Sequence, residues 1–178
     1  MSTTRPAESR SHLRPVPSTP GARSEEGGRG EPPPSGGPPP RIIVHPWSGP
    51  EARGPAHELR SEYVERFWLG VLGPSVTLLL RRLARGFDHH PGGYVIDVAD
   101  TARAIGLGSS TARNSPMNRT LERACMFSTM RRTAHDRYEV RRELPRLNAR
   151  QLARLPTVVR GAHDHWIRQH DATPPPAA

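Results

Sequence analysis

The chain has 178 residues, of which 21 are proline and 16 are glycine, and only 34% are hydrophobic. This length gives room for one ordinary domain, and the composition indicates that part of the chain lies outside a packed core. All 26 basic residues are arginine, and the net charge of +9 calls for an anionic partner: nucleic acid, an acidic protein or a membrane surface. The single cysteine, Cys125, excludes an internal disulfide and a cysteine-rich zinc site.

A membrane-spanning or exported protein is not expected. The N-terminus lacks the apolar core of a signal peptide, and the longest apolar stretch, Trp68 to Leu80, is broken by Gly73 and Pro74. That stretch has about 13 residues, too few to cross the ~30 Å of hydrocarbon in a bilayer. We therefore expect a soluble, cytoplasmic protein with no membrane partner.

Both ends of the chain differ in composition from its middle. Residues 1–40 hold 10 prolines and 6 glycines, and residues 171–178 are also rich in proline. Such segments bury too little apolar area to offset the ~1–2 kcal/mol per residue of lost backbone freedom. We expect disordered tails on either side of a single domain at residues 41–170, with a docking peptide in the N-terminal tail as the alternative.

The domain is expected to begin with an extended strap at residues 41–55. The apolar run 42–44 favours a strand, but Pro46 lacks the amide hydrogen that a central strand needs. The strap is therefore expected along the domain or at a sheet edge, with Trp47 anchored in the core.

Two amphipathic helices are expected next. From about residue 56 to 72, apolar side chains recur every four positions and charged side chains occupy the other face. Gly73 breaks this helix, Pro74 suits the first turn of the second, and Gly86 is expected to cap its end near residue 85. The apolar set of the first helix is Leu59, Tyr63, Phe67 and Val71.

A short strand and a third helix follow. Residues 94–98 are mostly aromatic or β-branched and are bounded by turn residues, which predicts a strand. Asp97 or Asp100 is expected to cap a helix at residues 98–105.

A fourth helix is predicted after the polar loop 108–114. Ser115 is expected to cap it, and Pro116 fits its first turn. Its inward stripe is Met117, Leu121, Ala124 and Cys125, and its outward residues are Asn118, Arg119, Glu122 and Arg123.

Residues 126–132 and 137–144 are predicted to form two strands of a hairpin. The second segment alternates between apolar and charged side chains, which is typical of a strand with one buried face. The arginines nearest the turn are Arg131, Arg132 and Arg137.

The order strand, helix, turn, helix, hairpin at residues 94–144 resembles a winged helix-turn-helix. Ala102 lies four residues before Gly106, as in that superfamily: a small residue lets the second helix cross closely, and glycine adopts positive φ in the turn. The linker 108–114 departs from the pattern, because it is longer than the usual turn of about three or four residues. The resemblance implies a mostly α fold with a small β-hairpin (α+β) and additional N- and C-terminal helices.

This resemblance also implies a DNA-binding site. The helix at 116–125 becomes a recognition helix, in which arginine reads guanine and asparagine reads adenine, and the hairpin at 126–144 becomes a basic wing. A solvated helix face and a plain charged hairpin are the alternatives. The implied contact residues are Arg113, Asn118, Arg119, Arg123, Arg131, Arg132 and Arg137.

Two C-terminal helices are expected to complete the domain at residues 148–170. Asn148 is expected to cap a short helix at 149–155, and a longer helix is predicted at 157–169. This last helix closes the domain or offers a homodimer surface. Its expected inward residues are Val158, Val159, Ala162 and Trp166.

The charge is concentrated where the resemblance places the DNA-binding site. Between Thr101 and Arg160 there are 13 arginines against 4 acidic residues, so this part carries the net charge of +9 of the whole chain. We expect a double-stranded DNA-binding protein, sequence-specific or general, that acts as a transcriptional regulator and is nucleoid-associated. The alternative is a non-catalytic interaction module whose basic winged surface binds an acidic protein.

A second resemblance extends from Tyr63 to Trp166. The segments F-W-L-x-V-L-G-P, A-x-x-x-G-L and R-R-E-L-P-R-L occur in this order in a family of uncharacterised proteins from high-GC actinobacteria. The lack of lysine fits such a genome, because arginine codons are GC-rich. This family brings no activity that could be transferred.

Catalysis and metal binding are not expected. The glycine-containing stretch 106–111 follows a helix, where a dinucleotide loop requires a strand, and an ATP-type loop requires a lysine that the chain lacks. No cysteine pair supports a zinc site, and histidines two apart on a helix diverge. We expect no enzyme activity, cofactor, metal or small-molecule ligand, and solvated side chains for His89, His90, His163, His165 and His170.

Overall fold

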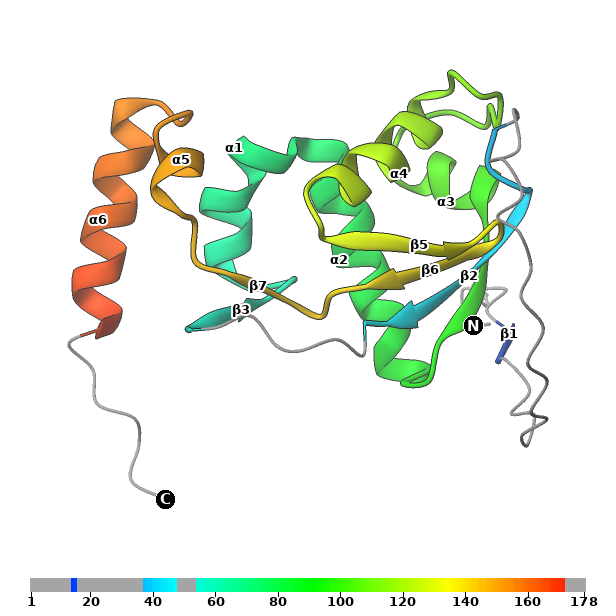
Figure 1. Ribbon diagram of the computed structural model, residues 1–178, viewed down its shortest axis with the longest axis horizontal. Helices are drawn as coiled ribbons and strands as arrows, with labels where there is room; N and C mark the ends of the chain where they lie inside the picture. The colour runs from blue at the N-terminus through cyan, green and yellow to red at the C-terminus, as the bar shows by residue number, and fades with distance from the viewer. Residues whose placement is uncertain (1–13, 16–36, 48–53, 172–178) are drawn as a thin grey trace, which may run out of the picture.

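The computed structural model describes residues 14–15, 37–47 and 54–171. It has the expected α+β fold, in which helices pack against a small mixed sheet (Figure 1). Most of the predicted tails, at 1–40 and 171–178, lie outside the described residues. The elements are β1 (Arg14–Pro15), β2 (Arg41–Pro46), β3 (Ala56–Glu58), η1 (Val64–Trp68), α1 (Leu69–Leu72), α2 (Pro74–His89), β4 (Tyr94–Asp97), α3 (Val98–Ala104), α4 (Pro116–Met126), β5 (Met130–Ala134), β6 (Arg137–Val140), β7 (Glu143–Pro145), α5 (Ala149–Leu152) and α6 (Thr157–Asp171).

The larger sheet has the strand order β1-β4-β2-β6-β5, so β2 is its central strand. β2 runs antiparallel to β4 and parallel to β6, and Ile43 pairs with Val95 on one side and Arg137 on the other. β5 and β6 form an antiparallel hairpin. β3 and β7 form a separate two-stranded sheet.

The prediction of a surface strap or edge strand is wrong for residues 41–46. Pro46 is the last residue of β2, where the missing amide hydrogen leaves the rest of the ladder intact. Ile42 and Val44 are fully buried, as a central position requires. Residues 48–53 of the predicted strap lie outside the described part of the chain.

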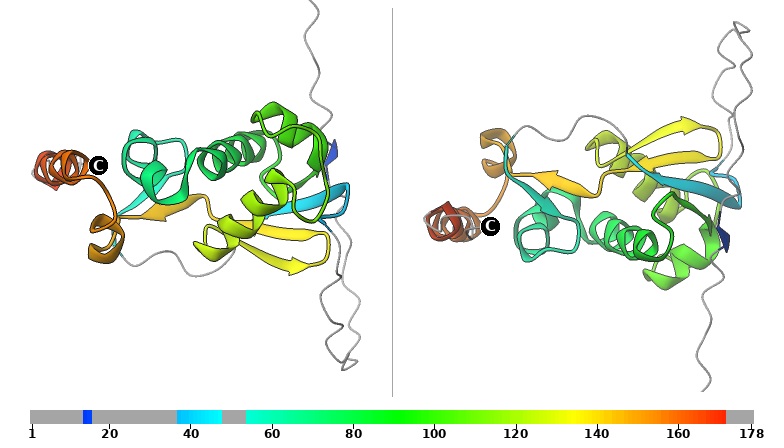
Figure 2. Two further views of the ribbon diagram at one scale, coloured as in Figure 1. Left: turned by 90° about the horizontal axis from the view of Figure 1, so that it is seen from above. Right: turned by 90° about the horizontal axis from the view of Figure 1, so that it is seen from below.

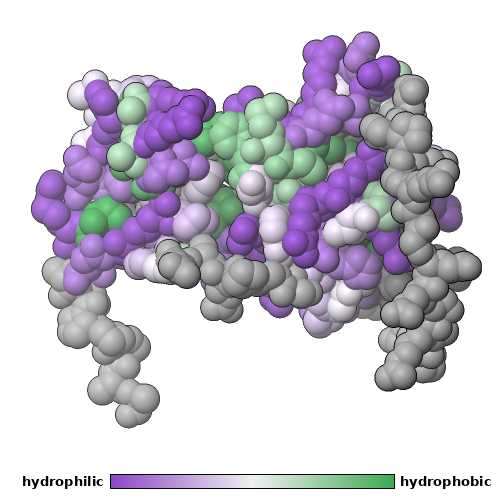
Figure 3. Space-filling model, viewed as in Figure 1, coloured by the Kyte–Doolittle hydropathy of each residue, from purple (hydrophilic) through white to green (hydrophobic). Residues whose placement is uncertain are grey.

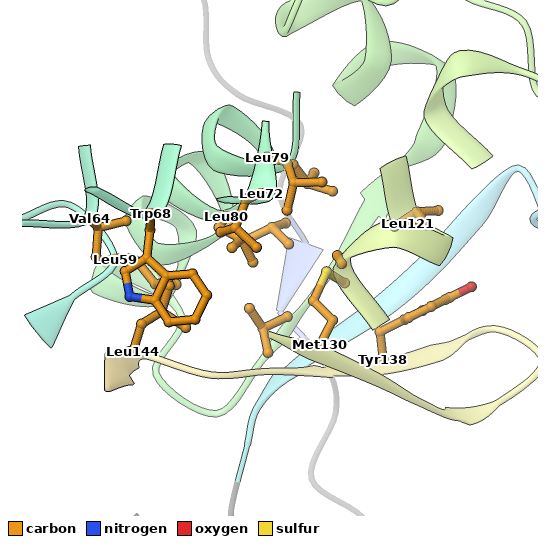
Figure 4. Close-up of a cluster of buried hydrophobic side chains, with 14 of the residues drawn as sticks. Leu59, Val64, Trp68, Leu72, Leu79, Leu80, Leu121, Met130, Tyr138 and Leu144 are labelled. Carbon is orange, nitrogen blue, oxygen red and sulfur yellow. The ribbon is translucent and has the colours of Figure 1, made fainter. Parts of the chain in front are cut away.

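The core lies between the larger sheet and the helices that cover one of its faces. Alternate side chains of β2, β4 and β6 are buried, and α2 and α4 contribute their apolar faces from the other side (Figure 4). Burial of a large apolar side chain stabilises the fold by about 1.5–3 kcal/mol. Viewed from above, α4 lies in front of β5 and β6, and viewed from below these strands lie in front of α4 (Figure 2).

The first predicted helix starts later than expected. Residues 56–58 form β3, because they pair with residues 143–145 of β7. Helical structure begins at Glu62 and continues through η1 and α1 to Leu72. The predicted apolar set, Leu59, Tyr63, Phe67 and Val71, is buried as expected.

The second predicted helix runs past its expected end. α2 continues through Gly86 to His89, so the prediction that Gly86 caps the helix is wrong. A Cβ atom at Gly86 would lie 2.1 Å from the hydroxyl oxygen of Tyr94, which donates a hydrogen bond to the Leu83 carbonyl at 2.9 Å. Glycine therefore occurs here because the Tyr94 ring packs directly against the helix backbone.

The helix starts around the predicted turn are confirmed. The Asp97 carboxylate accepts a hydrogen bond from the amide of Asp100 and begins α3, and the Ser115 hydroxyl accepts from the amide of Asn118 and begins α4. Gly106 has a φ of 78°, as the predicted tight turn requires.

The hairpin is shorter than predicted. Since α4 extends to Met126, the first strand starts at Met130 rather than at residue 126. After Val140 the chain leaves the larger sheet, and β7 pairs with β3 and buries Leu144. The predicted strand 137–144 is thus two strands in two sheets.

The C-terminal helices begin where the sequence predicts. Asn148 and Gln151 form a capping box at the start of α5. In α6, Trp166 is buried as expected, but Val158 is 84% exposed rather than inward. His163 is buried, so the prediction of a solvated side chain is wrong for this histidine, whose ring meets the Tyr63 hydroxyl. Among the described residues, no helix is long and apolar enough to cross a membrane.

Candidate nucleic-acid interface

The loop before α4 and the hairpin turn lie at the same end of the molecule, at the right of Figure 1 and in both views of Figure 2. Three of the seven predicted contact residues are exposed, and their guanidinium groups have no partner among the described residues. Arg113 lies in the loop, Arg119 on the outward face of α4, and Arg137 directly after the hairpin turn. These three guanidinium groups are free to bind an anion.

Asn118 does not face outward, contrary to the prediction. It is buried, and its side-chain amide donates to the Arg113 carbonyl at 2.6 Å and to the Glu122 carboxylate at 2.9 Å. The loop folds back over the start of α4 and uses both amide hydrogens of Asn118. Its role is to hold this loop, and with it Arg113, against the helix.

Arg123 is also unavailable for base contacts. Its Nε donates to the Leu72 carbonyl at 2.6 Å and its Nη2 to the Val71 carbonyl at 2.9 Å. These carbonyls end α1 and have no partner within that helix. The guanidinium carbon also lies 5.0 Å from the ring centre of Phe127. Arg123 therefore joins α4 to the end of α1.

Arg132 closes the hairpin turn. Its guanidinium donates to the His135 carbonyl at 2.7 Å and to the Ala134 carbonyl at 3.2 Å, and lies 5.9 Å from the Tyr138 ring centre. Two backbone carbonyls hold this guanidinium at the turn. Its main role is to fix the shape of the hairpin.

Arg131 belongs to a cluster that the sequence did not reveal. It pairs with Glu139 opposite it on β6, with 2.5 Å between Nη2 and the carboxylate. Its guanidinium carbon also lies 4.5 Å from the ring centre of Trp47, and that of Arg141 lies 4.2 Å from the same ring. Trp47 is half-buried beside the hairpin rather than anchored in the core.

Arg141, which the sequence-based prediction did not include, completes this cluster. Its Nε donates to the Ser128 carbonyl at 2.9 Å, and this places the guanidinium beside Trp47. No local pattern predicts the contact, because it requires β2 to lie beside β6, where the Trp47 amide donates to the Val140 carbonyl at 2.8 Å.

Cys125 on α4 is half-buried. Burial raises the pKa of the Cys125 thiol, which disfavours the nucleophilic thiolate. No set of three histidine, cysteine or acidic side chains in the described part of the chain is placed to hold a metal ion.

Comparison with protein-family models, with curated proteins and with solved structures finds no match for this chain. The resemblances to winged-helix proteins and to an actinobacterial family stay predictions.

Proposed function

We propose that the protein is a winged helix-turn-helix variant that binds double-stranded DNA and regulates transcription. In this proposal α4 enters the major groove with Arg113 and Arg119 at its N-terminal end, and the β5–β6 hairpin is the wing and carries Arg137. The observation that carries the proposal is that the loop before α4, which holds Arg113, and the hairpin turn, which Arg137 follows, lie at one end of the molecule. Arg119 is exposed near the start of α4, and a helix and a hairpin are the two elements that such proteins use to contact DNA.

The order of the elements supports this proposal. α2, β4, α3, α4, β5 and β6 follow one another as a helix, strand, two helices and hairpin. β4 is antiparallel to β2 and β2 is parallel to β6, so β4 and β6 run in opposite directions, but β2 lies between them. The inserted central strand and the long α3–α4 loop distinguish this variant.

A salt series tests the proposal. A labelled duplex of about 20 base pairs should bind at ~50 mM salt. A plot of the logarithm of the binding constant against the logarithm of the salt concentration should have a slope of about −0.9 for each phosphate that the protein neutralises. No binding to any duplex at ~50 mM salt would contradict the proposal. Selection from a random duplex library would show whether binding is sequence-specific.

Single substitutions locate the contact. Arg113→Ala and Arg119→Ala should each cost about 1–3 kcal/mol of binding free energy if these side chains reach bases. Arg82→Ala is the matched control, because Arg82 is an exposed arginine on α2. Equal losses from all three variants would indicate diffuse attraction rather than a docked helix.

A protein partner is the second candidate, because hydrophobic surface lies next to the basic end. In Figure 3 this hydrophobic surface lies in the upper middle of the view, between α1 and the end of α4. The exposed apolar side chains of the described residues include Leu69, Leu78 and Met126. Exposed apolar patches are typical of protein-binding surfaces. Salt-resistant capture of one acidic protein without nucleic acid would favour this function.

A further inference from the structure

We propose that the sheet face pointing away from α4 is a second contact surface for the phosphate backbone of the nucleic acid, and that Trp47 positions Arg131 and Arg141 on it. This inference rests on the proposed DNA-binding function. It assigns the cluster around Trp47 a role that neither α4 nor the hairpin turn explains.

Strand alternation places these side chains on one face. Met130, Tyr138 and Val140 point into the core, so their neighbours along the strands point to the other side of the sheet. Arg131 pairs with Glu139 across the hairpin. The amide of Arg141 donates to the Thr129 carbonyl at 3.0 Å, which extends the ladder by one residue pair.

Trp47 reaches this face because β2 is the central strand. β2 ends at Pro46, which pairs with Val140, and the Trp47 amide donates to the Val140 carbonyl at 2.8 Å. The indole thus lies beside Arg141, which directly follows the neighbouring strand β6, and beside Arg131 in the next strand, β5. An edge strand or a loose strap would not fix Trp47 between these strands.

The face is basic even after its internal ion pair is counted. On the β5–β6 hairpin, Arg131, Arg137 and Arg141 share this face with one acidic residue, Glu139. Further along the sheet, Arg41 of β2 lies opposite Asp97 of β4 on the same face, so this pair adds no net charge. The Arg131 side chain remains 47% exposed. Nε of Arg141 donates to the Ser128 carbonyl, and the two terminal nitrogens of Arg141 have no partner among the described residues. Exposed N–H groups therefore remain for an anion.

Phosphate fits this surface better than a nucleobase does. Two guanidinium groups at 4.5 and 4.2 Å from the ring centre leave little of the indole surface for a stacking base. A guanidinium offers a planar fork of donors that matches the oxygens of a phosphate. Arg131 is already held by Trp47 and Glu139, and Arg141 is held by Trp47 and the Ser128 carbonyl. These two side chains therefore lose less conformational entropy on binding than free arginines would.

The test compares four variants of the full chain by fluorescence anisotropy with a labelled duplex and a labelled single strand. Trp47→Leu removes the ring, Trp47→Phe keeps an aromatic face, Arg141→Ala removes a proposed contact, and Arg82→Ala removes an exposed charge on α2. Thermal unfolding of each variant shows that it is folded at the assay temperature.

We expect Arg141→Ala to weaken duplex binding about fivefold or more and to reduce the salt slope by about 1, as the loss of one phosphate contact requires. Trp47→Leu should weaken binding about threefold or more, since cation–π contacts hold both arginines in place. Trp47→Phe should restore most of the affinity, because phenylalanine still offers a ring face. Arg82→Ala should change affinity by less than about twofold, because distant exposed charges are screened.

The outcomes separate this inference from the proposed function. If Arg119→Ala weakens binding but Trp47→Leu and Arg141→Ala bind as the wild type does, the sheet face is not a contact surface and the DNA-binding proposal stands. If only the single strand binds and binding depends on Trp47 and Arg141, the duplex proposal fails and the phosphate surface stands. If neither nucleic acid binds, or only a polyglutamate peptide does, both fail.

Discussion

The hydroxyl of Tyr63 lies 2.9 Å from Nε2 of His163, which is one hundred residues further along the chain in α6. The same hydroxyl accepts a hydrogen bond from the amide of Leu147 at 2.9 Å. Tyr63 directly precedes η1, and all three residues are buried. One side chain thus fastens both α6 and the segment after β7 to the body of the fold.

Replacing this hydroxyl should loosen the C-terminal part of the protein. Tyr63→Phe leaves the Leu147 amide without its partner, and an unpaired buried polar group costs about 1–3 kcal/mol. We expect a loss of this size in the free energy of unfolding, measured in urea. The matched control is Tyr138→Phe, because Tyr138 is buried and its hydroxyl has no hydrogen bond among the described residues. Equal losses in the two variants would show that the Tyr63 hydroxyl has no special role.

The stability of the fold should fall between about pH 6.5 and pH 4 because of His57. Its ring stacks on Tyr63 at 3.8 Å between centres. Burial, helped by the positive charge of Arg146 and by His170 and His163, lowers the pKa of His57 to about 4 from its usual 6.5. In this pH window the unfolded chain binds a proton that the folded chain does not bind, so acidification favours unfolding.

His57→Phe tests this pH dependence, because phenylalanine retains the stacked ring and cannot take up a proton. Urea unfolding of the variant should show a flatter decline between pH 7 and pH 5 than that of the wild type. His165→Phe, on the exposed side of α6, is the control and should decline as the wild type does. A variant at His57 that declines as steeply as the wild type would assign the pH dependence to other groups.

Two glycines in helices should respond in opposite ways to the same substitution. Alanine usually stabilises a helix by about 0.8–1 kcal/mol relative to glycine. Gly161→Ala in α6 should show this gain, because a Cβ there has no atom within 4 Å. Gly86→Ala should instead destabilise the fold by about 1–3 kcal/mol, because the new methyl would overlap the Tyr94 ring. Thermal unfolding measures both, and a stabilising Gly86→Ala would show that Tyr94 can move aside.

Features fixed by neighbouring residues were predicted well from the sequence. Asp97 and Ser115 cap their helices through amides three residues later, and Gly106 adopts its positive φ within a single turn. The amphipathic stripe from Leu59 to Val71 also follows from local spacing. Each of these signals lies within a short window of the chain.

Features fixed by distant residues were not predicted. The central position of β2 depends on the pairing of Ile43 with Arg137, and the sequence around Pro46 alone favours an edge. Asn118 was expected to be exposed because helical periodicity places it on the outward face of α4. Periodicity does not predict the loop that folds over this face and buries Asn118. The predicted site therefore contained arginines that are used inside the fold, and it did not include Arg141, which belongs to the proposed phosphate surface.

Substitutions of Arg123 and Arg119 should distinguish an arginine that stabilises the fold from an arginine that is proposed to contact DNA. Arg123→Met keeps much of the apolar stem but loses both hydrogen bonds to the carbonyls that end α1. We expect a loss of about 1–3 kcal/mol in the free energy of unfolding, because these carbonyls lose their charged donor. Affinity for duplex DNA should change no more than in Arg82→Met, as long as both variants are folded at the assay temperature.

Arg119→Met should behave in the opposite way. Arg119 is exposed on the same helix and its guanidinium has no partner among the described residues, so its loss should change stability by less than about 0.5 kcal/mol. It should weaken DNA binding, because in the proposed complex this side chain lies in the groove. Measuring both stability and affinity for both variants makes the comparison decisive. If Arg123→Met weakened binding as much as Arg119→Met while remaining fully stable, Arg123 would have to leave α1 and reach the DNA.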